Sequence, residues 1–485
     1  MRHYAEILVF VMVAAFVPLA AQADVTISSA ATLNMGCANG VCAPTAANAV
    51  LNAGDLETML ASQNVTVTTT GSGIQADNID IAAALSWTSN SRLALDAYRS
   101  INIGRALEIK GVGGLSLSDN DGGNQGRITF SGRGNVTFNN LSSQLVIHGV
   151  AFMLVGDIST LAGDIAQNPA GNFALANNYN AGLDGPYANP PIGTTFTGSF
   201  EGLGHTISKL RIRTRSFTNM GLFAEVGTGG AIKNLGLHGE LISAPGGDVG
   251  GLAGQNSGTL YGVDVEAKIT IVGEQGGVVI GGIAGYNYGT IEQSSAEGAI
   301  KAPESSDTAG GAAGYNYGTL ETVRAGGAVT GDYGVGAGLV GDNEATIAES
   351  FATGSINANT AGGLVGRANQ GSISNSYATG GVFGATNQTA GFAASSNGTI
   401  TASYSTGIAP VGFITDYDNR AESYCYWDTT TSGTSIGSGP GITGRTTQQL
   451  QRHLPRGFDP KIWTQNPNIN GGLPYLIANP PFIPN

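Results

Sequence analysis

The chain has 485 residues, of which 76 are glycine and only 11% are charged. Apolar residues make up 41%, which excludes a chain that is too polar to bury a core. The formal net charge is −13 and there is no basic cluster, so neither nucleic acid nor a polyanionic glycan is an expected partner. We attribute the sparse charge to solubility, and expect many short strands joined by tight turns.

The first 23 residues have the pattern of a secretory signal peptide. Arg2 and His3 precede an apolar run over residues 7–21, and Ala21-Gln22-Ala23 forms a small-residue cleavage site before Asp24. No later apolar stretch is long enough to cross a bilayer. We therefore predict that residues 1–23 are removed, that the mature chain starts near Asp24, and that it leaves the cytoplasm.

Three cysteines lie in the mature chain. Cys37 and Cys42 flank the four residues ANGV, and in an oxidising compartment this spacing favours a small local disulfide. A zinc site is the rival interpretation, but no histidine or further cysteine lies near them. Cys425 is left over, and we interpret it as a buried small apolar residue.

Residues 24–165 read as a short helix followed by strands. The helix is predicted at Asp55–Leu60, with a capping residue before an apolar face. The strand segments alternate apolar and polar residues. They are Asn64–Gly71, Arg92–Ile103, Arg127–Gly132, Asn135–Asn140 and Gln144–Val150. Residues 166–192 hold four prolines among many Asn and Gly, which predicts a loop-rich join to the C-terminal half of the chain.

Residues 193–430 contain an internal repeat. A glycine-rich unit, GG-aliphatic-x-G or a looser form of it, recurs with its second residue at Gly251, Gly282, Gly311, Gly338, Gly363 and Gly391. Each unit continues into a turn and a strand start such as GTL or GTI. Asparagine precedes most of these turns, at Asn256, Asn287, Asn316, Asn343, Asn369 and Asn397. Strand-like alternation without a helical period predicts short strands with Asn and Gly at the turns.

One such unit of about 28 residues cannot bury its apolar face alone, but stacked units can. The predicted fold class is therefore all-β, an elongated β-helix or β-solenoid with one coil per repeat. Stacking places equivalent residues above one another, so we expect the repeated asparagines to form an inward hydrogen-bonded ladder. Phe351, Tyr377 and Tyr404 share one repeat position and are expected to stack.

The repeat resembles the GLUG motif, a glycine-rich repeat of bacterial cell-surface and secreted proteins. The copy GGLVGRANQGSISNSYATG at 362–380 carries the resemblance most closely. The lead-in GSFEGLGHTISKL (198–210) and the exit SYCYWD (423–428) with NGGLPYL (470–476) are similar to the usual ends of such arrays. The resemblance covers about residues 190–480, and it implies a secreted or surface-displayed protein.

The preceding half resembles the passenger regions of filamentous-haemagglutinin-type adhesins, through the order DLETMLASQNVTVTTTG…NIDIAAALSWTSNSRLALDAYRSINI. That resemblance implies that residues 24–165 are β-helical and join the same rod. The NPNG- or NPNL-like motifs of the two-partner secretion domain do not precede this region. NPNI occurs only at 466–469, so the exporter partner is left open.

Residues 431–485 are expected to close the stack. Residues 431–445 are rich in Gly, Ser and Thr and predict a loop, Thr446–Leu454 predicts a short helix, and a Pro-rich tail ends the chain. A closing segment is expected because an open solenoid end exposes a strand edge that would aggregate.

We find no catalytic motif in the sequence. The five histidines, His205 among them, form no HExxH signature, and no G-x-S-x-G elbow is present. GVGGLS (111–116) is not in the context of a phosphate loop, and SDNDGGNQG (118–126) fits a solvated turn better than a calcium loop. Five carboxylates are interpreted as scattered over the repeat, without a catalytic pair: Asp264, Glu266, Glu292, Glu297 and Glu321. We therefore expect no enzyme activity, no metal and no cofactor.

One binding site is proposed from the sequence. GYNYG occurs twice, at 285–289 and 314–318. If the asparagines point inward, alternation sends Tyr286, Tyr288, Tyr315 and Tyr317 outward as an aromatic patch suited to sugar faces or an apolar partner. The alternative is that these aromatic side chains merely cover a sheet face.

The predicted function is that of a secreted or cell-surface adhesin-like solenoid, which presents a binding surface to a host or cell-surface glycan or protein. The expected location is extracellular or on the outer cell surface, with the periplasm as the alternative. The alternative function is a carbohydrate-active β-helix enzyme, a polysaccharide lyase or hydrolase, which needs a cleft with convergent titratable groups. A degenerate passenger with little activity is a third option.

Overall fold

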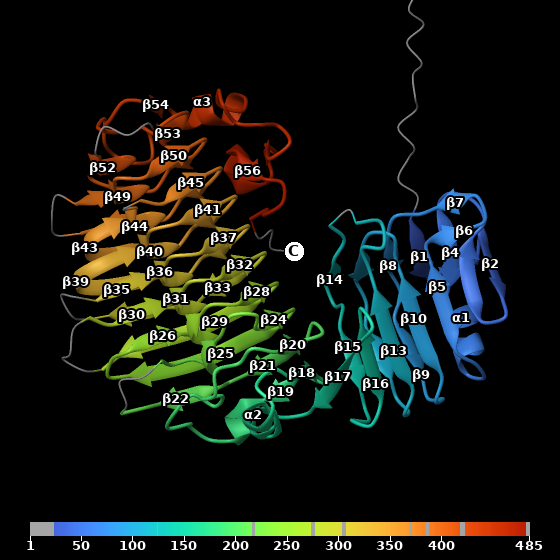
Figure 1. Ribbon diagram of the computed structural model, residues 1–485. Helices are drawn as coiled ribbons and strands as arrows, with labels where there is room; N and C mark the ends of the chain where they lie inside the picture. The colour runs from blue at the N-terminus through green and yellow to red at the C-terminus, as the bar shows by residue number, and fades with distance from the viewer. Residues whose placement is uncertain are drawn as a thin grey trace, which may run out of the picture.

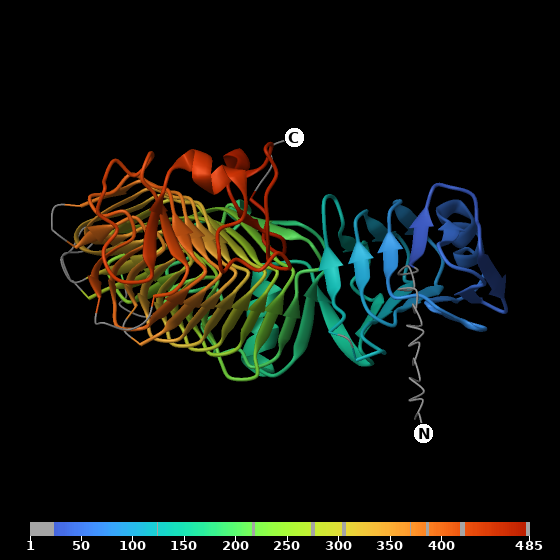
Figure 2. The ribbon, with the colours of Figure 1, turned by 90° about the horizontal axis from the view of Figure 1, so that it is seen from above.

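The computed structural model describes residues 24–123, 125–215, 219–272, 277–302, 307–368, 370–384, 388–417 and 422–481. The predicted signal peptide lies outside these residues. Short strands stack into two β-solenoids that meet at an elbow (Figures 1 and 2). The first runs from β1 (Val25–Ser28) to about β16 (Gln144–Ile147), and the second is larger and holds the glycine-rich repeats. The predicted β-solenoid fold class is confirmed.

A single sheet runs through both solenoids and forms one wall of each. Within the described residues it has 16 strands. In spatial order they are β2 (Met35–Ala38), β3 (Val41–Pro44), β5 (Val65–Thr68), β10 (Arg92–Asp96), β13 (Gly114–Ser118), β16, β17 (Val150–Val155), β18 (Asn172–Leu175), β20 (Ser199–Glu201), β24 (Ala231–Lys233), β28 (Thr259–Tyr261), β32 (Thr290–Glu292), β37 (Thr319–Glu321), β41 (Thr346–Ala348), β45 (Ser372–Ser374) and β50 (Thr399–Thr401).

Two further sheets close the first solenoid. One comprises β14 (Ile128–Phe130), β11 (Ile101–Ile103), β8 (Ile79–Ile81), β1 (Val25–Ser28) and β4 (Ala49–Asn52). The other comprises β15 (Val136–Phe138), β12 (Leu107–Ile109) and β9 (Leu85–Trp87). Apolar residues alternate with polar ones along each strand, as in β1, so every strand sends one face into a continuous core.

The second solenoid is closed by an 8-stranded and a 20-stranded sheet, counted over the described residues. The former comprises β23 (Phe223–Val226), β27 (Ala253–Asn256), β31 (Ala284–Asn287), β36 (Ala313–Asn316), β40 (Val340–Asn343), β44 (Val365–Ala368), β49 (Ala393–Ser396) and β52 (Ile414–Tyr417). The latter comprises β19 (Tyr179–Asn180), β21 (Thr206–Ser208), β22 (Arg211–Arg213), β25 (Gly236–Ala244), β26 (Asp248–Gly250), β29 (Asp264–Ile271), β30 (Val279–Gly281), β33 (Ser295–Glu297), β34 (Ile300–Ala302), β35 (Thr308–Gly310), β38 (Arg324–Ala325), β39 (Val329–Ala337), β42 (Phe351–Ala352), β43 (Ile356–Gly362), β46 (Tyr377–Ala378), β47 (Val382–Phe383), β48 (Thr389–Ala390), β51 (Tyr404–Ser405), β53 (Cys425–Asp428) and β54 (Ile442–Arg445).

A hairpin at the elbow turns the shared sheet over. β16 and β17 pair antiparallel, whereas the neighbouring pairs in this sheet are parallel. Beyond the hairpin both faces of the sheet are covered: Leu154 and Ala174 pack into the first core, and Phe173 and Leu175 into the second. The second core therefore lies on the opposite face of the sheet. As a result, the outer face of the second solenoid is turned toward the first.

The predicted asparagine ladder is present over four coils. Asn256, Asn287, Asn316 and Asn343 are fully buried, and each amide nitrogen donates to the next Oδ1 at 2.7, 2.8 and 2.7 Å. The coils joined in this way are 31, 29 and 27 residues long. The ladder ends there because Ala368 is the partner of Asn343 in register and Ser396 follows it. The prediction was wrong for Asn397, which is exposed, and Asn369 lies outside the described residues.

Both ends of the chain carry covering elements. At the start, the hairpin β2–β3 and the helix α1 (Ala53–Leu60), capped by Asn52, cover the first coil. At the other end, α3 (Thr447–Arg452) has the capping box of Thr446 and Gln449, and the pair β55 (Trp463–Thr464) and β56 (Tyr475–Leu476) folds back along the side of the stack. The small hairpin of β6 (Thr70–Gly71) and β7 (Ile74–Gln75) completes the strands.

The segment 166–192, expected to be a loop-rich join, holds more regular structure than predicted. The helix α2 (Ile158–Gln167), which we did not predict, packs into the second core and ends inside this segment. Next come β18, β19, the short 3₁₀ helix η1 (Ala181–Leu183) and the loops between them. A second 3₁₀ turn, η2 (Asn470–Gly472), lies near the C-terminus.

Candidate functional site

The two GYNYG copies place four tyrosine rings together on the outer face of the second solenoid. Tyr286 on β31 and Tyr315 on β36 are in register, with ring centres 5.1 Å apart and planes at 12°. Tyr288 and Tyr317, in the turns after these strands, stack at 5.3 Å and 8°. Their side chains are 48% and 44% exposed. We name these four residues the tyrosine patch.

Polar groups border the tyrosine patch. Along the sheet, Tyr315 is followed in register by Asp342 and then Arg367, which pair at 3.1 Å. Burial raises the pKa of Asp342 to about 6, and Arg367 opposes that shift. Burial, and next the Asp248 carboxylate, raise the pKa of Tyr286 to about 12. The Tyr286 phenol is therefore a hydrogen-bond donor at physiological pH.

A second aromatic row is buried and does not form a binding surface. Phe351, Tyr377 and Tyr404 stack in register, as predicted, at 4.6 and 5.1 Å. The returning C-terminal segment covers them with Phe458 and Trp463. This row therefore anchors the closing segment to the side of the stack.

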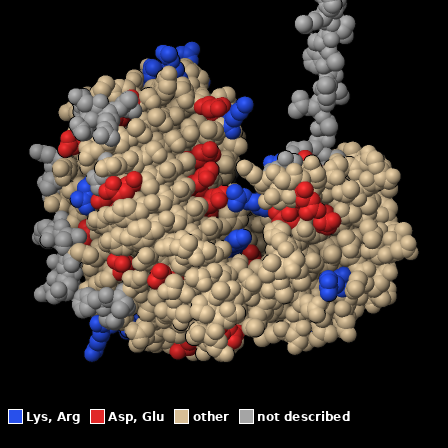
Figure 3. Space-filling model, in the orientation of Figure 1, with Lys and Arg blue, Asp and Glu red and all other residues tan. Residues whose placement is uncertain are grey.

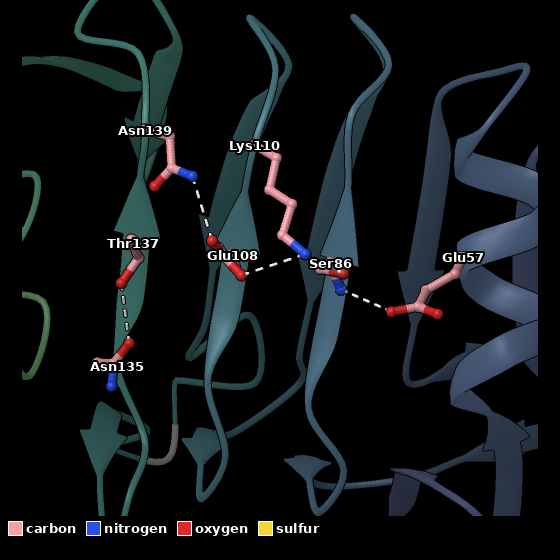
Figure 4. Close-up of polar contacts among 7 residues, drawn as sticks. All are labelled: Glu57, Ser86, Glu108, Lys110, Asn135, Thr137 and Asn139. Carbon is pink, nitrogen blue, oxygen red and sulfur yellow. Dashed lines mark hydrogen bonds and ion pairs between the residues drawn. The ribbon is translucent and has the colours of Figure 1, made fainter.

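The outer face of β9, β12 and β15 in the first solenoid carries a polar network (Figure 4). Lys110 bridges Ser86 at 3.3 Å and Glu108 at 3.4 Å, and Asn139 donates to Glu108 at 3.1 Å. Glu57 of α1 accepts from the Ser86 backbone at 2.7 Å and ties the helix to this face. We assign the network a structural role, because its groups are satisfied by one another.

A groove separates the two solenoids on the inner side of the elbow, with acidic and basic side chains facing each other across it (Figure 3). One wall is the outer face of the shared sheet. Because coils stack in register, a single column of side chains lines this wall, one from each strand from β18 to β37. In order they are Ala174, Glu201, Lys233, Tyr261, Glu292 and Glu321. We name this row the groove column.

The groove column corrects the interpretation that the carboxylates are scattered. Glu292 and Glu321 are direct neighbours in register, and so are Glu266 and Glu297 on β29 and β33. The missed signal is one repeat position, the residue after the central apolar residue in SFE, AIK, TLY, TIE and TLE. Aligning the coils on that apolar residue would have shown a column of charged and aromatic residues.

Glu201 is the most deeply buried charged member of the groove column. It is 5% exposed, and its Oε1 accepts from Asn234 Nδ2 at 2.8 Å and from the Leu203 backbone at 3.2 Å. No partner of Oε2 lies among the described residues. Burial raises the pKa of Glu201 to about 7, although both hydrogen bonds and Lys233 oppose the shift. Such a carboxyl group exchanges its proton near neutral pH.

Residues of the first solenoid complete a cavity over Glu201, with a volume of about 360 Å³. Arg127 reaches across to the groove column, where it pairs with Glu292 at 2.6 Å and lies 4.8 Å from the centre of the Tyr261 ring. His148 pairs with Asp119 at 2.5 Å, and this bond raises the pKa of His148. Lys233 also lines the cavity, and no ion pair or hydrogen bond of its ammonium group is found among the described residues.

A second cavity, of about 690 Å³, adjoins the first and shares Asn234 and Tyr261 with it. In it, Asp264 accepts from Ser295 and pairs with His238 at 3.0 Å. Asp264 thus lies between His238 and Ser295. The His238 ring therefore does not contact the Ser295 hydroxyl and cannot activate it as a nucleophile. His205, instead, is buried and bonds to the Val136 carbonyl at 2.7 Å, which links the two solenoids.

The cysteines and other candidate sites are placed as follows. Cys37 and Cys42 face each other across the β2–β3 hairpin and form a disulfide, while Cys425 is buried and free. Among the residues that the structure describes, no group of three or more His, Cys, Asp or Glu is arranged to hold a metal ion. Searching the same residues finds no helix with the length and apolar character that a membrane crossing requires.

Comparison with known proteins matches one part of the chain to a family. The family model described as "The GLUG motif" matches residues 357–382, so the predicted GLUG motif is confirmed there. Halomucin of Haloquadratum walsbyi is 28% identical over 223 residues. That alignment covers 45% of this chain and 2% of halomucin, so the chain spans a small fraction of its relative. A solved structure of an IgA1 protease has 19% identity and a TM-score of 0.38, over 53% of this chain and 23% of that one.

Proposed function

We propose that this protein is a non-enzymatic, adhesin-type solenoid that is exported and displayed at the cell surface or outside the cell, where its tyrosine patch binds glycans. The tyrosine patch is the single observation that carries the proposal. Two of its rings are nearly half exposed, although their neighbours in most other coils are small or polar residues. An exposed aromatic cluster on a rigid sheet is typical of a binding surface.

The surroundings of the tyrosine patch favour a sugar over an apolar protein surface. Sugars offer apolar ring faces together with hydroxyl groups, and the tyrosine patch offers aromatic rings bordered by phenols, Asp248 and the Asp342–Arg367 pair. The Asp248 carboxylate can accept hydrogen bonds from sugar hydroxyls, and Arg367, held by the buried Asp342, can donate them. A purely apolar partner would cover Asp248 and the phenols without offering them hydrogen bonds.

The wider assignment is supported by the GLUG motif at residues 357–382 and by the likeness to halomucin. The resemblance of residues 24–165 to filamentous-haemagglutinin-type passengers and the signal-peptide pattern of residues 1–23 agree with it. The export route beyond the signal peptide is left open.

The test is glycan binding by a variant with all four tyrosines of the patch replaced by serine. We expect the wild-type protein to bind on a glycan array and the variant to lose that signal while its circular dichroism spectrum is unchanged. Phe383→Ser removes another exposed aromatic side chain of the same solenoid and serves as the matched control. Equal binding by the quadruple variant, or no glycan binding by the wild-type protein, would refute the proposal.

A second candidate function is a carbohydrate-active enzyme. One observation favours it: the groove brings Glu201, Asp119 and His148 to one cavity, which meets the requirement for convergent titratable groups. The test is whether the purified protein releases reducing ends or unsaturated products from polysaccharides. Such release, together with its loss in Glu201→Gln, would establish the enzymatic function. A complete lack of turnover across a broad polysaccharide panel would instead favour the binding protein.

A further inference from the structure

The cavity over Glu201 contains two polar groups that the protein itself leaves unsatisfied. The other charged side chains there are paired, His148 with Asp119 and Arg127 with Glu292. The ammonium group of Lys233 and the Oε2 atom of Glu201 have no partner among the described residues. Glu201 is 5% exposed and Lys233 is half-buried, and both line the cavity, so a molecule that enters the cavity can satisfy both groups.

The unsatisfied groups are adjacent. Glu201 and Lys233 are in register on β20 and β24, so they are neighbours across one strand spacing of about 4.8 Å on the same face of the sheet. When Glu201 is protonated, Oε2 can carry the proton and donate a hydrogen bond, because Oε1 already accepts two. Lys233 is then a cation without a counter-charge from Glu201. Together they offer hydrogen-bond donors and one positive charge to the same point in the cavity.

We propose that this cavity binds an acidic sugar, with Lys233 pairing with its carboxylate and the protonated Glu201 donating a hydrogen bond to the same group. The site is separate from the tyrosine patch and adds a second ligand class to the protein. The chain as a whole is acidic, which disfavours a polyanion, but Lys233 is the one cation of this cavity without a partner among the described residues, and it fits a single carboxylate.

The lining of the groove favours a sugar over an acidic peptide. Besides its charged side chains, it offers the Tyr261 ring together with amides and hydroxyls, from side chains such as Gln125, Asn234, Thr259 and Ser295. The strands that form its wall are paired on both sides within the sheet, so a peptide cannot add as a further strand. The second cavity continues the groove and has room for further sugar units.

The pH dependence of binding is set by the groups that face Glu201. β18 contributes only Ala174, β24 contributes Lys233, β28 contributes Tyr261, and the first solenoid contributes Asp119, His148 and Arg127. When Glu201 ionises, it competes with the ligand for Lys233 and repels the ligand carboxylate. Binding should therefore weaken as the pH rises through neutrality, and Glu201→Gln should remove most of that dependence because glutamine stays neutral and can still donate.

The test uses the mature full-length chain and two probes that differ in one group, methyl β-glucuronide and methyl β-glucoside, titrated by calorimetry or NMR at pH 5.5 and pH 8. We expect the glucuronide to bind at least about tenfold more tightly than the glucoside at pH 5.5, and to lose about tenfold by pH 8. Lys233→Gln should abolish this preference. Glu201→Gln should keep the affinity at pH 5.5 and lose less of it by pH 8 than the wild type does, the remaining loss reflecting deprotonation of His148 beside Asp119.

Further probes identify the source of the carboxylate. Acetate and N-acetylglutamate should bind much more weakly than the glucuronide, because they lack the sugar hydroxyls. Three outcomes would each overturn the proposal. They are equal affinity for acetate or N-acetylglutamate, no preference of the wild type for the glucuronide over the glucoside, and an unchanged preference in Lys233→Gln. The variant lacking the tyrosine patch should bind the glucuronide normally, so failure of this site and failure of the proposed function are distinguishable.

Discussion

Glu201 makes folding stability depend on pH, and Glu201→Gln should remove that dependence. Burial raises the pKa of Glu201 to about 7 in the folded protein, against an ordinary value of 4.5. The folded state therefore holds its proton more tightly than the unfolded state. The stabilising contribution is fully present below pH 4.5 and is lost as the pH rises through 7. Since one pKa unit corresponds to 1.36 kcal/mol, the loss amounts to about 3 kcal/mol.

The glutamine variant suits this test because its amide oxygen can still accept from Asn234 and from the Leu203 backbone, as Glu201 Oε1 does. The assay is urea unfolding of both proteins at several pH values between 4 and 8.5, and the measured quantity is the difference between their unfolding free energies. Glu240 is a second buried carboxyl group, and burial raises its pKa well above the ordinary value. Its contribution to the pH dependence is the same in both proteins, so it cancels when their unfolding free energies are subtracted. We expect the difference to move by about 3 kcal/mol in favour of the variant between pH 4.5 and 8. A difference that stays constant over this range would refute the buried placement of Glu201.

Three further perturbations test the solenoid itself. Asn316→Ala should lower the unfolding free energy by about 3 kcal/mol, because it removes bonds to both neighbouring coils, and Asn256→Ala at the end of the ladder by about half as much, as measured in urea. Cys37→Ser with Cys42→Ser should cost about 2 kcal/mol, the value for a short closed loop, and reduction of the wild type should cause the same loss of thermal stability. Thr322 has a φ of 59°, which is strained for a β-branched residue, so Thr322→Gly should raise the unfolding free energy by about 1 kcal/mol; a decrease would show that the corner is unstrained.

The repeat was predictable because stacking imposes one register on every coil. The recurrence of glycine and asparagine about every 28 residues placed Asn256, Asn287 and Asn316 above one another, and the structure joins them by amide hydrogen bonds. The limit of this reasoning is visible at Asn397. There the register follows the strand hydrogen bonds, so Ser396 takes the inward position and the asparagine one residue later is exposed.

The groove could not be predicted in the same way, because it depends on how two stacks lie relative to each other. The hairpin at His148 and Gly149, both with positive φ, reverses the chain between β16 and β17. No repeat period marks this reversal, and the segment after it was expected to be a loop-rich join. The contact between Arg127 and Glu292 joins residues of different solenoids, so no local pattern could place them together.

The reversal also explains why the charged column lies in the groove rather than in open solvent. Had the second solenoid continued from the first without turning over, the face of the sheet that carries Glu201 would have been its inner face. Instead Glu201 shares a face with Ala174, which packs against the first core. The hairpin thus converts an outer surface position into a wall that the other solenoid covers. Burial, to which the first solenoid contributes, is the main cause of the raised pKa of Glu201 rather than any neighbouring charge. It leaves Glu201 and Lys233 together in a cavity that a ligand can enter.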